Sequence, residues 1–214
     1  MKPIANFSVL LTCVLVAVLL GGDKGSRGHV LGLSPYHSSL VSWENGVFDR
    51  SLKKLHQQER LHERGLEHQI AQILAHYKTG LKKDRRLRVP EWIVEESFKY
   101  GYDPLLLTAL IITESSFYNW ARSNQGALGL MQVRPFTGKA VAREIRMKWK
   151  GKSTLHDPKA NIALGAYYLN KMILRFGDLG LALEAYNHGP SQLGRYLRKG
   201  YRPKRYSQKV FQQY

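Results

Sequence analysis

The chain has 214 residues, which fits one domain or at most two. Its 33 Lys and Arg residues against 16 Asp and Glu give a formal net charge of +17, which indicates a polyanionic partner such as nucleic acid, anionic lipid or an acidic wall polymer. The 43% content of hydrophobic residues excludes wholesale disorder, and a single Cys excludes an internal disulfide framework or a Cys-based zinc site.

The N-terminus has the pattern of an export segment. Lys2 precedes an almost uninterrupted apolar run from Phe7 to Leu20, which is then followed by Gly21 and Gly22. A positive start with an apolar core of about 14 residues is typical of a signal peptide, and it is short for a membrane span of about 20 residues. Residues 1–22 are therefore predicted to be a signal peptide or a membrane anchor. Either would carry the rest of the chain out of the cytosol.

Residues 23–88 are predicted to be a linker and a basic, amphipathic extension. Residues 23–48 are rich in Gly, Ser and His and have little periodicity. Residues 49–78 carry apolar side chains at helical spacing, which predicts an amphipathic helix interrupted near Gly65. The basic run at 82–88 favours a solvated linker, and contact with an anionic envelope is the alternative.

From residue 89 to 214 the sequence predicts one all-α domain, because no alternating run is long enough for a sheet. Pro90 fits the first position of one helix, and Asp103-Pro104 fits the N-cap and first position of the next. Gly189-Pro190 is interpreted as a stop signal. The predicted helices cover residues 91–100, 103–117, 137–149, 158–176 and 178–187.

Glu114 is a carboxylate on an apolar helix face. The positions that share this face are occupied by Leu107, Leu110, Ile111 and Phe117. Burial on this face, and the negative end of the helix dipole, should both raise the pKa of Glu114. A raised pKa is what a general acid needs at neutral pH, whereas the alternative role is a structural cap or ion pair at the helix end.

The segments that follow supply groups suited to a sugar with hydroxyl and N-acetyl substituents. Gly126 and Gly129 permit a tight loop that a ligand can approach closely. Around these glycines, Ser123 supplies a hydroxyl, Met131 an apolar surface and Gln132 an amide. Farther along the chain, Tyr186 and Asn187 lie at the end of a predicted helix.

These residues form three motifs in order: Glu-Ser at 114–115, Gly-Leu-Met-Gln at 129–132 and Ala-Tyr-Asn at 185–187. Together they resemble the soluble-type lytic transglycosylase (SLT) domain of the goose-type lysozyme-like superfamily. The resemblance covers roughly residues 88–214, and it implies a lysozyme-like helical fold with a substrate cleft.

The resemblance also implies roles for individual residues. Glu114 would be the sole catalytic acid/base, and Ser123 would contact the muramyl N-acetyl group or the glycan near the scissile bond. Tyr186 would hydrogen-bond near Glu114 and orient it, and Asn187 would support that end of the cleft. The cleft would further be lined by Gln132 and by the backbone of Gly129 to Met131. Neither a metal nor another cofactor is implied.

Two residues depart from the family pattern. Arg134 stands where an apolar residue is expected, and His188 where a small one is expected. Both leave the chemistry intact and bear on the cleft lining and the substrate preference. His188 is interpreted as a cleft-edge or surface residue rather than as a second catalytic group.

By this resemblance the reaction is non-hydrolytic cleavage of the β-1,4 bond between N-acetylmuramic acid and N-acetylglucosamine in peptidoglycan, giving a 1,6-anhydro product. Most glycosidases use two carboxylates. Here Asp103 lies about 16 Å from Glu114 along the helix, and Asp157, Asp178 and Glu184 occupy positions that suit caps or the surface.

Two alternatives stay open: a lysozyme-like hydrolytic muramidase, and a wall-remodelling component of a secretion or conjugation apparatus. A nucleic-acid partner is disfavoured by the export-like N-terminus. Together with the export segment, the resemblance implies a place in the bacterial cell envelope, on the periplasmic side. The basic charge then fits retention on an acidic wall, with membrane attachment and envelope machinery as further expected partners.

Overall fold

The computed structural model describes residues 35–214, with side chains from residue 49 onward. The described part divides into two units, one that ends at Lys53 and one that spans residues 54–214. The predicted signal or anchor at residues 1–22 lies outside the described residues. Within the described part, no helix is long and apolar enough to cross a membrane.

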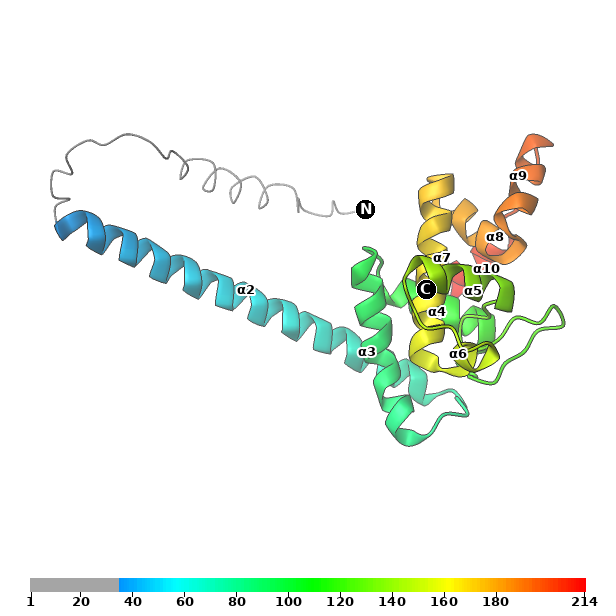
Figure 1. Ribbon diagram of the computed structural model, residues 1–214, viewed down its shortest axis with the longest axis horizontal. Coiled ribbons are helices and arrows are strands. Elements are labelled where there is room, and N and C mark those ends of the chain that lie inside the picture. Colours follow the sequence, from blue (N-terminus) through cyan, green and yellow to red (C-terminus); the bar gives the residue numbers. More distant parts are fainter. Residues whose placement is uncertain (1–34) are drawn as a thin grey trace. The chain divides into compact units, whose positions relative to one another are not determined.

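Helix α2 runs without a break from Pro35 to Ala75 (Figure 1). Residues 35–48 of the predicted linker are therefore helical, and the predicted interruption at Gly65 is wrong, whereas residues 23–34 of that linker lie outside the described residues. Pro35 suits the first turn of a helix, and a single Gly costs a helix only about 1 kcal/mol relative to Ala. In the second unit, α2 contributes Ile70 and Leu74 to the hydrophobic core.

Helix α3 runs from Lys83 to Lys99 and carries Pro90 in its interior, so the helix predicted to begin at Pro90 begins seven residues earlier. From Lys83 onward the basic run is helical and is therefore not a linker, although most of its side chains are exposed as predicted. The Arg86 guanidinium donates hydrogen bonds to the carbonyls of Leu74 and Ala75 at the end of α2. Arg85 pairs with Asp157 at 2.9 Å. A local proline signal is overridden here by tertiary contacts.

Helix α4 runs from Pro104 to Ser115, with Asp103 as its N-cap accepting a hydrogen bond from the Leu105 N–H at 2.8 Å. The sequence predicted that this helix continues to about Phe117. Instead, Ser116 and Phe117 have positive φ values of 49° and 59°. This left-handed turn ends the helix directly after Glu114 and Ser115.

The remaining helices agree in part with the sequence. The predicted helix at 158–176 is confirmed, the helix predicted at 178–187 is shifted by one residue, and the helix predicted at 137–149 is shorter. Three further helices were not predicted, and one of them starts at the predicted stop Pro190. The helices are α5 (Pro135–Glu144), α6 (Lys152–His156), α7 (Pro158–Phe176), α8 (Leu179–His188), α9 (Pro190–Arg198) and α10 (Arg205–Gln213).

The all-α prediction is confirmed for the described residues, whose only β-type pairings are isolated bridges around Leu128. Helix α7 packs against α3, α5, α6 and α8, and α10 packs against α4 and α8 (Figure 1). This arrangement brings the end of α4, the end of α8 and the start of α10 together.

Candidate active site

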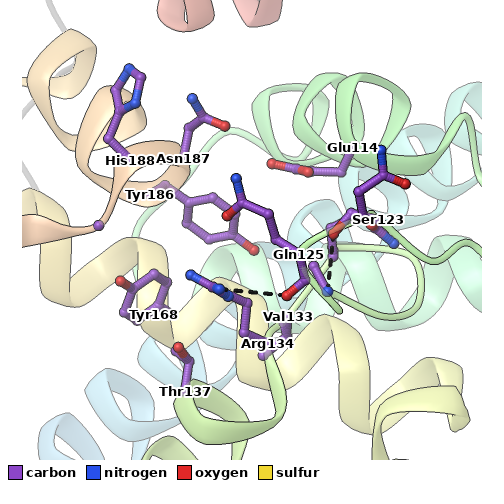
Figure 2. Close-up of a pocket in the computed structure, with 14 residues that line it drawn as sticks. Glu114, Ser123, Gln125, Val133, Arg134, Thr137, Tyr168, Tyr186, Asn187 and His188 are labelled. Carbon is purple, nitrogen blue, oxygen red and sulfur yellow. Dashed lines mark hydrogen bonds between the residues drawn. The ribbon is translucent and has the colours of Figure 1, made fainter. Parts of the chain in front are cut away.

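Glu114 lies in the last turn of α4 and lines a pocket of about 410 Å³. Its carboxylate points into the pocket, with Tyr186 and Asn187 on the opposite side (Figure 2). Among the described residues, Glu114 is the one carboxylate in the pocket lining. The other lining residues are Ser123, Asn124, Gln125, Ala127, Gln132, Val133, Arg134, Thr137, Tyr168, Tyr186, Asn187, His188 and Gly189.

The apolar surroundings of Glu114 change its acidity. Leu107, Leu110 and Ile111, which share its helix face, are fully buried, and so is Phe117, which lies in the turn after the helix and not on its face as the sequence predicted. Burial raises the pKa of Glu114 to about 7, while a hydrogen bond from Tyr206 and the charge of Lys209 act in the opposite direction. The rise agrees with the expectation from the sequence. A substantial fraction of Glu114 is therefore protonated at neutral pH, as a general acid must be.

Tyr206, on α10, is the hydrogen-bond partner of Glu114, and the sequence reasoning missed it. Burial is the main cause that raises the pKa of the Tyr206 hydroxyl far above its ordinary value, so the group stays a proton donor. It lies 92 positions from Glu114 along the chain. No motif marks it, and only the packing of α10 on α4 brings the two together.

Tyr186 makes a different contact from the one that the resemblance implies. Its hydroxyl donates to the Met131 carbonyl at 2.8 Å, and its ring packs on Tyr168. Tyr186 therefore ties the loop at 129–132 to α8. The hydrogen bond that Glu114 accepts comes from Tyr206.

The Gly-Leu-Met-Gln segment reaches the pocket at Gln132, and hydrogen bonds fix it to α7 and α4. Asn161 of α7 accepts from the Met131 N–H at 2.7 Å and donates to the Leu128 carbonyl at 2.9 Å. Ser115, next to Glu114, donates to the Leu130 carbonyl at 2.7 Å. Met131 is fully buried, and neither it nor Gly129 is among the lining residues. Their predicted contact with glycan stays a prediction.

Ser123 and Gln132 line the pocket and also support its loop. The Ser123 hydroxyl accepts from the Ala127 N–H at 3.0 Å. The Gln132 amide donates to the carbonyls of Ala121 and Gly129. These hydrogen bonds hold the loop in place.

Comparison with known proteins shows to which family this site belongs. A family model described as the transglycosylase SLT domain matches residues 91–209, which is more than half of the chain. The chain belongs to the transglycosylase SLT domain family.

Relatives and a solved structure agree with the SLT assignment. The chain is 37% identical over 102 residues to a transglycosylase of Enterobacteria phage PRD1, covering 48% of this chain and 35% of the phage protein. It is 45% identical over 84 residues to the endo-type membrane-bound lytic murein transglycosylase A of Klebsiella pneumoniae, covering 37% of this chain and 39% of that enzyme.

The solved structure is an inactive mutant of the lytic transglycosylase Slt from Pseudomonas aeruginosa, in which Gln replaces Glu. The TM-score is 0.52 at 30% identity, over 57% of this chain and 22% of that chain. This likeness supports the predicted lysozyme-like helical fold. The chain thus covers well under half of each of these three proteins.

The two departures from the SLT pattern both lie in the pocket lining. Arg134 donates to the Gln125 carbonyl at 3.5 Å, across the loop (Figure 2). His188, at the end of α8, has its Nε2 atom 3.4 Å from Glu184 Oε2. A cleft-edge position for His188 agrees with the interpretation from the sequence.

Of the remaining carboxylates in this SLT domain, Glu184 differs from expectation. Asp157 and Asp178 are N-caps of α7 and α8, as predicted. Glu184 is neither a cap of its own helix nor a surface residue, because it is fully buried in the middle of α8. Its partner Ser207 lies on α10, a helix that the sequence did not predict.

Proposed function

We propose that this chain is a peptidoglycan lytic transglycosylase with Glu114 as its single acid/base. The observation that carries the proposal is a Glu114 carboxyl with a pKa of about 7 that opens into the pocket of an SLT domain. Support comes from the relatives, one described as a lytic murein transglycosylase, and from the Slt mutant, in which the loss of a glutamate carboxylate accompanies inactivity.

The chemistry needs one carboxyl that acts twice. Protonated Glu114 donates its proton to the glycosidic oxygen while the muramyl N-acetyl group stabilises the sugar cation. The resulting carboxylate then removes the proton of the C6 hydroxyl, and that oxygen closes the 1,6-anhydro ring. No water enters the product. A pKa near 7 allows the same group to act first as acid and then as base.

The pocket lining offers hydrogen-bonding groups around this centre. Ser123, Gln132 and Asn187 present hydroxyl and amide groups at its rim, which suit the N-acetyl and hydroxyl groups of a glycan. We assign these three residues to glycan binding. Tyr186 holds the loop at 129–132 in place, and Tyr206 orients Glu114.

The proposal extends to the setting of the enzyme. The substrate is the glycan of the bacterial wall, the location is the cell envelope, and the catalytic part is residues 89–214. The basic charge, net +10 for residues 91–214 with 19 basic and 9 acidic groups, suits a wall that carries acidic peptide stems.

Products distinguish this function from its nearest rival, a hydrolytic muramidase on the same fold. Purified sacculi treated with the protein should release muropeptides that mass spectrometry finds lighter by one water than hydrolysed ones. Products with reducing muramic acid ends would identify a hydrolase, and the absence of release would remove the enzymatic proposal. A hydrolase needs a group that holds water on the far side of the sugar, and Glu114 is the one carboxylate of the described pocket lining.

Tyr206→Phe tests the partner of Glu114. The change keeps the ring and removes the hydroxyl whose hydrogen bond lowers the pKa of Glu114, so that pKa should rise. The alkaline limb of the kcat/KM profile, where Glu114 loses its proton, should move to higher pH. The turnover rate should fall about tenfold because Glu114 loses its orientation.

A matched control is Tyr214→Phe, which removes an exposed hydroxyl that donates to Asp103 at the other end of α4. It should leave both the rate and the pH profile unchanged. An unchanged alkaline limb in Tyr206→Phe would mean that the hydroxyl does not act on Glu114 during turnover.

A further inference from the structure

Glu184 is a buried carboxylate with no part in the proposed chemistry. It is fully buried, and its Oε1 atom accepts a hydrogen bond from the Ser207 N–H at 2.8 Å. The Ser207 hydroxyl lies 3.0 Å from the same oxygen. Burying a carboxylate is costly unless its hydrogen bonds repay the lost hydration, so such a residue needs a structural or functional reason.

The reason lies at the beginning of α10. This helix runs from Arg205 to Gln213, and Lys204 at its N-cap position makes no side-chain capping hydrogen bond. Ser207 is the third residue of the helix, where the backbone N–H has no acceptor within the helix. Glu184 supplies that acceptor from α8, and its negative charge suits the positive end of the α10 dipole. It caps α10 from a neighbouring helix.

The residue next to Ser207 is Tyr206, which donates to Glu114. Two consecutive residues in the first turn of α10 are thus held by carboxylates on two different helices, Ser207 by α8 and Tyr206 by α4. A shift of this turn that broke the Ser207 contact would also move the Tyr206 hydroxyl relative to Glu114. The Glu184 charge also acts to raise the pKa of Tyr206, which keeps its hydroxyl protonated.

We propose that Glu184 is a positioning residue, which fixes the start of α10 and thereby holds the Tyr206 hydroxyl on the Glu114 carboxyl. This inference rests on the proposed function for its kinetic consequence, and the contacts that carry it are independent of the reaction. The second oxygen of Glu184, Oε2, has no hydrogen-bond partner within the described part of the chain and lies 3.4 Å from His188 Nε2. The oxygen that caps α10 is therefore Oε1. A glutamine at this position has one carbonyl oxygen, which can take the place of Oε1.

The test uses two replacements of similar length. Glu184→Gln keeps an oxygen that accepts from Ser207, whereas Glu184→Met fills the same volume without an acceptor. On solubilised peptidoglycan strands, Glu184→Met should lower kcat at least about tenfold and leave KM within about twofold, because a misplaced acid affects the chemical step. Glu184→Gln should stay close to the wild type.

Two controls separate positioning from a general loss of stability. Glu96 is a buried glutamate on α3 that pairs with Lys99 and lies outside the pocket lining, so Glu96→Met should leave kcat unchanged in the folded protein. In a Tyr206→Phe background, Glu184→Met should lower kcat little further, because its effect passes through the hydroxyl already removed.

An NMR measurement makes the inference independent of activity. In protein with labelled tyrosine rings, the Tyr206 signal, identified by its loss in Tyr206→Phe, should move in Glu184→Met and stay in place in Glu184→Gln.

If Glu184→Met does not fold, Ser207→Ala replaces it as the test. Ser207→Ala should lower kcat by less than Glu184→Met, and it should not lower kcat further in the Tyr206→Phe background. A wild-type kcat in Glu184→Met, a full additional loss in the double variant, or an unmoved Tyr206 signal would each overturn the proposal. An inactive wild type would refute the proposed function and leave the NMR result to decide on Glu184.

Discussion

Glu114→Gln is expected to lower the rate of peptidoglycan cleavage by about 10³-fold or more, because the amide neither donates the proton to the leaving oxygen nor removes one from the C6 hydroxyl. Glutamine has nearly the shape of glutamate, and its carbonyl oxygen still accepts from Tyr206. The pocket should therefore keep its form while the chemistry stops. The measurement is the release of muropeptides from sacculi at several pH values.

The same variant should be more stable than the wild type at alkaline pH. The folded-state pKa of Glu114 is about 7, above its ordinary value of 4.5. As the pH rises, the unfolded wild-type chain loses the Glu114 proton at a lower pH than the folded protein does. The part of the free energy of unfolding that is linked to Glu114 is therefore fully present below pH 4.5 and is lost as the pH rises through about 7. The loss is at most about 3 kcal/mol. Denaturant unfolding at pH 5 and pH 8 should show that Glu114→Gln removes most of this difference.

The matched control is Glu95→Gln, which makes the same chemical change at an exposed residue that pairs with Lys159. It should cleave at the wild-type rate and keep the wild-type pH dependence of stability. A well-folded Glu114→Gln protein that degraded sacculi at nearly the wild-type rate would show that another group is the acid.

The sequence was most informative where one local signal sufficed. Asp-Pro at 103–104 and at 157–158 marks the starts of α4 and α7, since an aspartate cap and a first-turn proline act within a few residues. The apolar face around Glu114 followed from helical spacing alone. These features predicted the direction of the pKa shift of Glu114, whereas its assignment as the acid came from the resemblance carried by the three motifs.

What could not be predicted depends on contacts between distant segments. Helix α10 is short, largely polar, and has no capping side chain of its own, so nothing local distinguishes it from a tail. Its cap comes from Glu184 on α8, and Tyr206 reaches Glu114 only because α10 packs on α4. Because α10 was not predicted, neither the contact of Tyr206 with Glu114 nor the reason for burying Glu184 could be predicted.

Gly129→Ala should destabilise the domain by about 3 kcal/mol, and Gly126→Ala by only about 1 kcal/mol. Both glycines have positive φ, 80° and 78°, so an added Cβ costs similar backbone strain at each. A Cβ on Gly129 would lie 2.3 Å from Asn161 Nδ2 and 2.4 Å from the Leu155 carbonyl oxygen, whereas one on Gly126 meets nothing within 4 Å. Denaturant unfolding gives the free energy of unfolding of each variant. Because the backbone strain is similar in both, the difference between the two variants measures the cost of the steric clash at Gly129.

The clash at Gly129 should also reach the active site, because Asn161 is the residue that holds the loop at 129–132. If its amide moves, the Met131 N–H and the Leu128 carbonyl lose buried hydrogen bonds, and such losses cost about 1–3 kcal/mol each. The Met131 carbonyl that Tyr186 binds would shift with them. Cleavage by folded Gly129→Ala should therefore fall, while Gly126→Ala keeps its rate. Equal stability and equal rates in the two variants would show that the close approach of Gly129 to Asn161 does not shape the site.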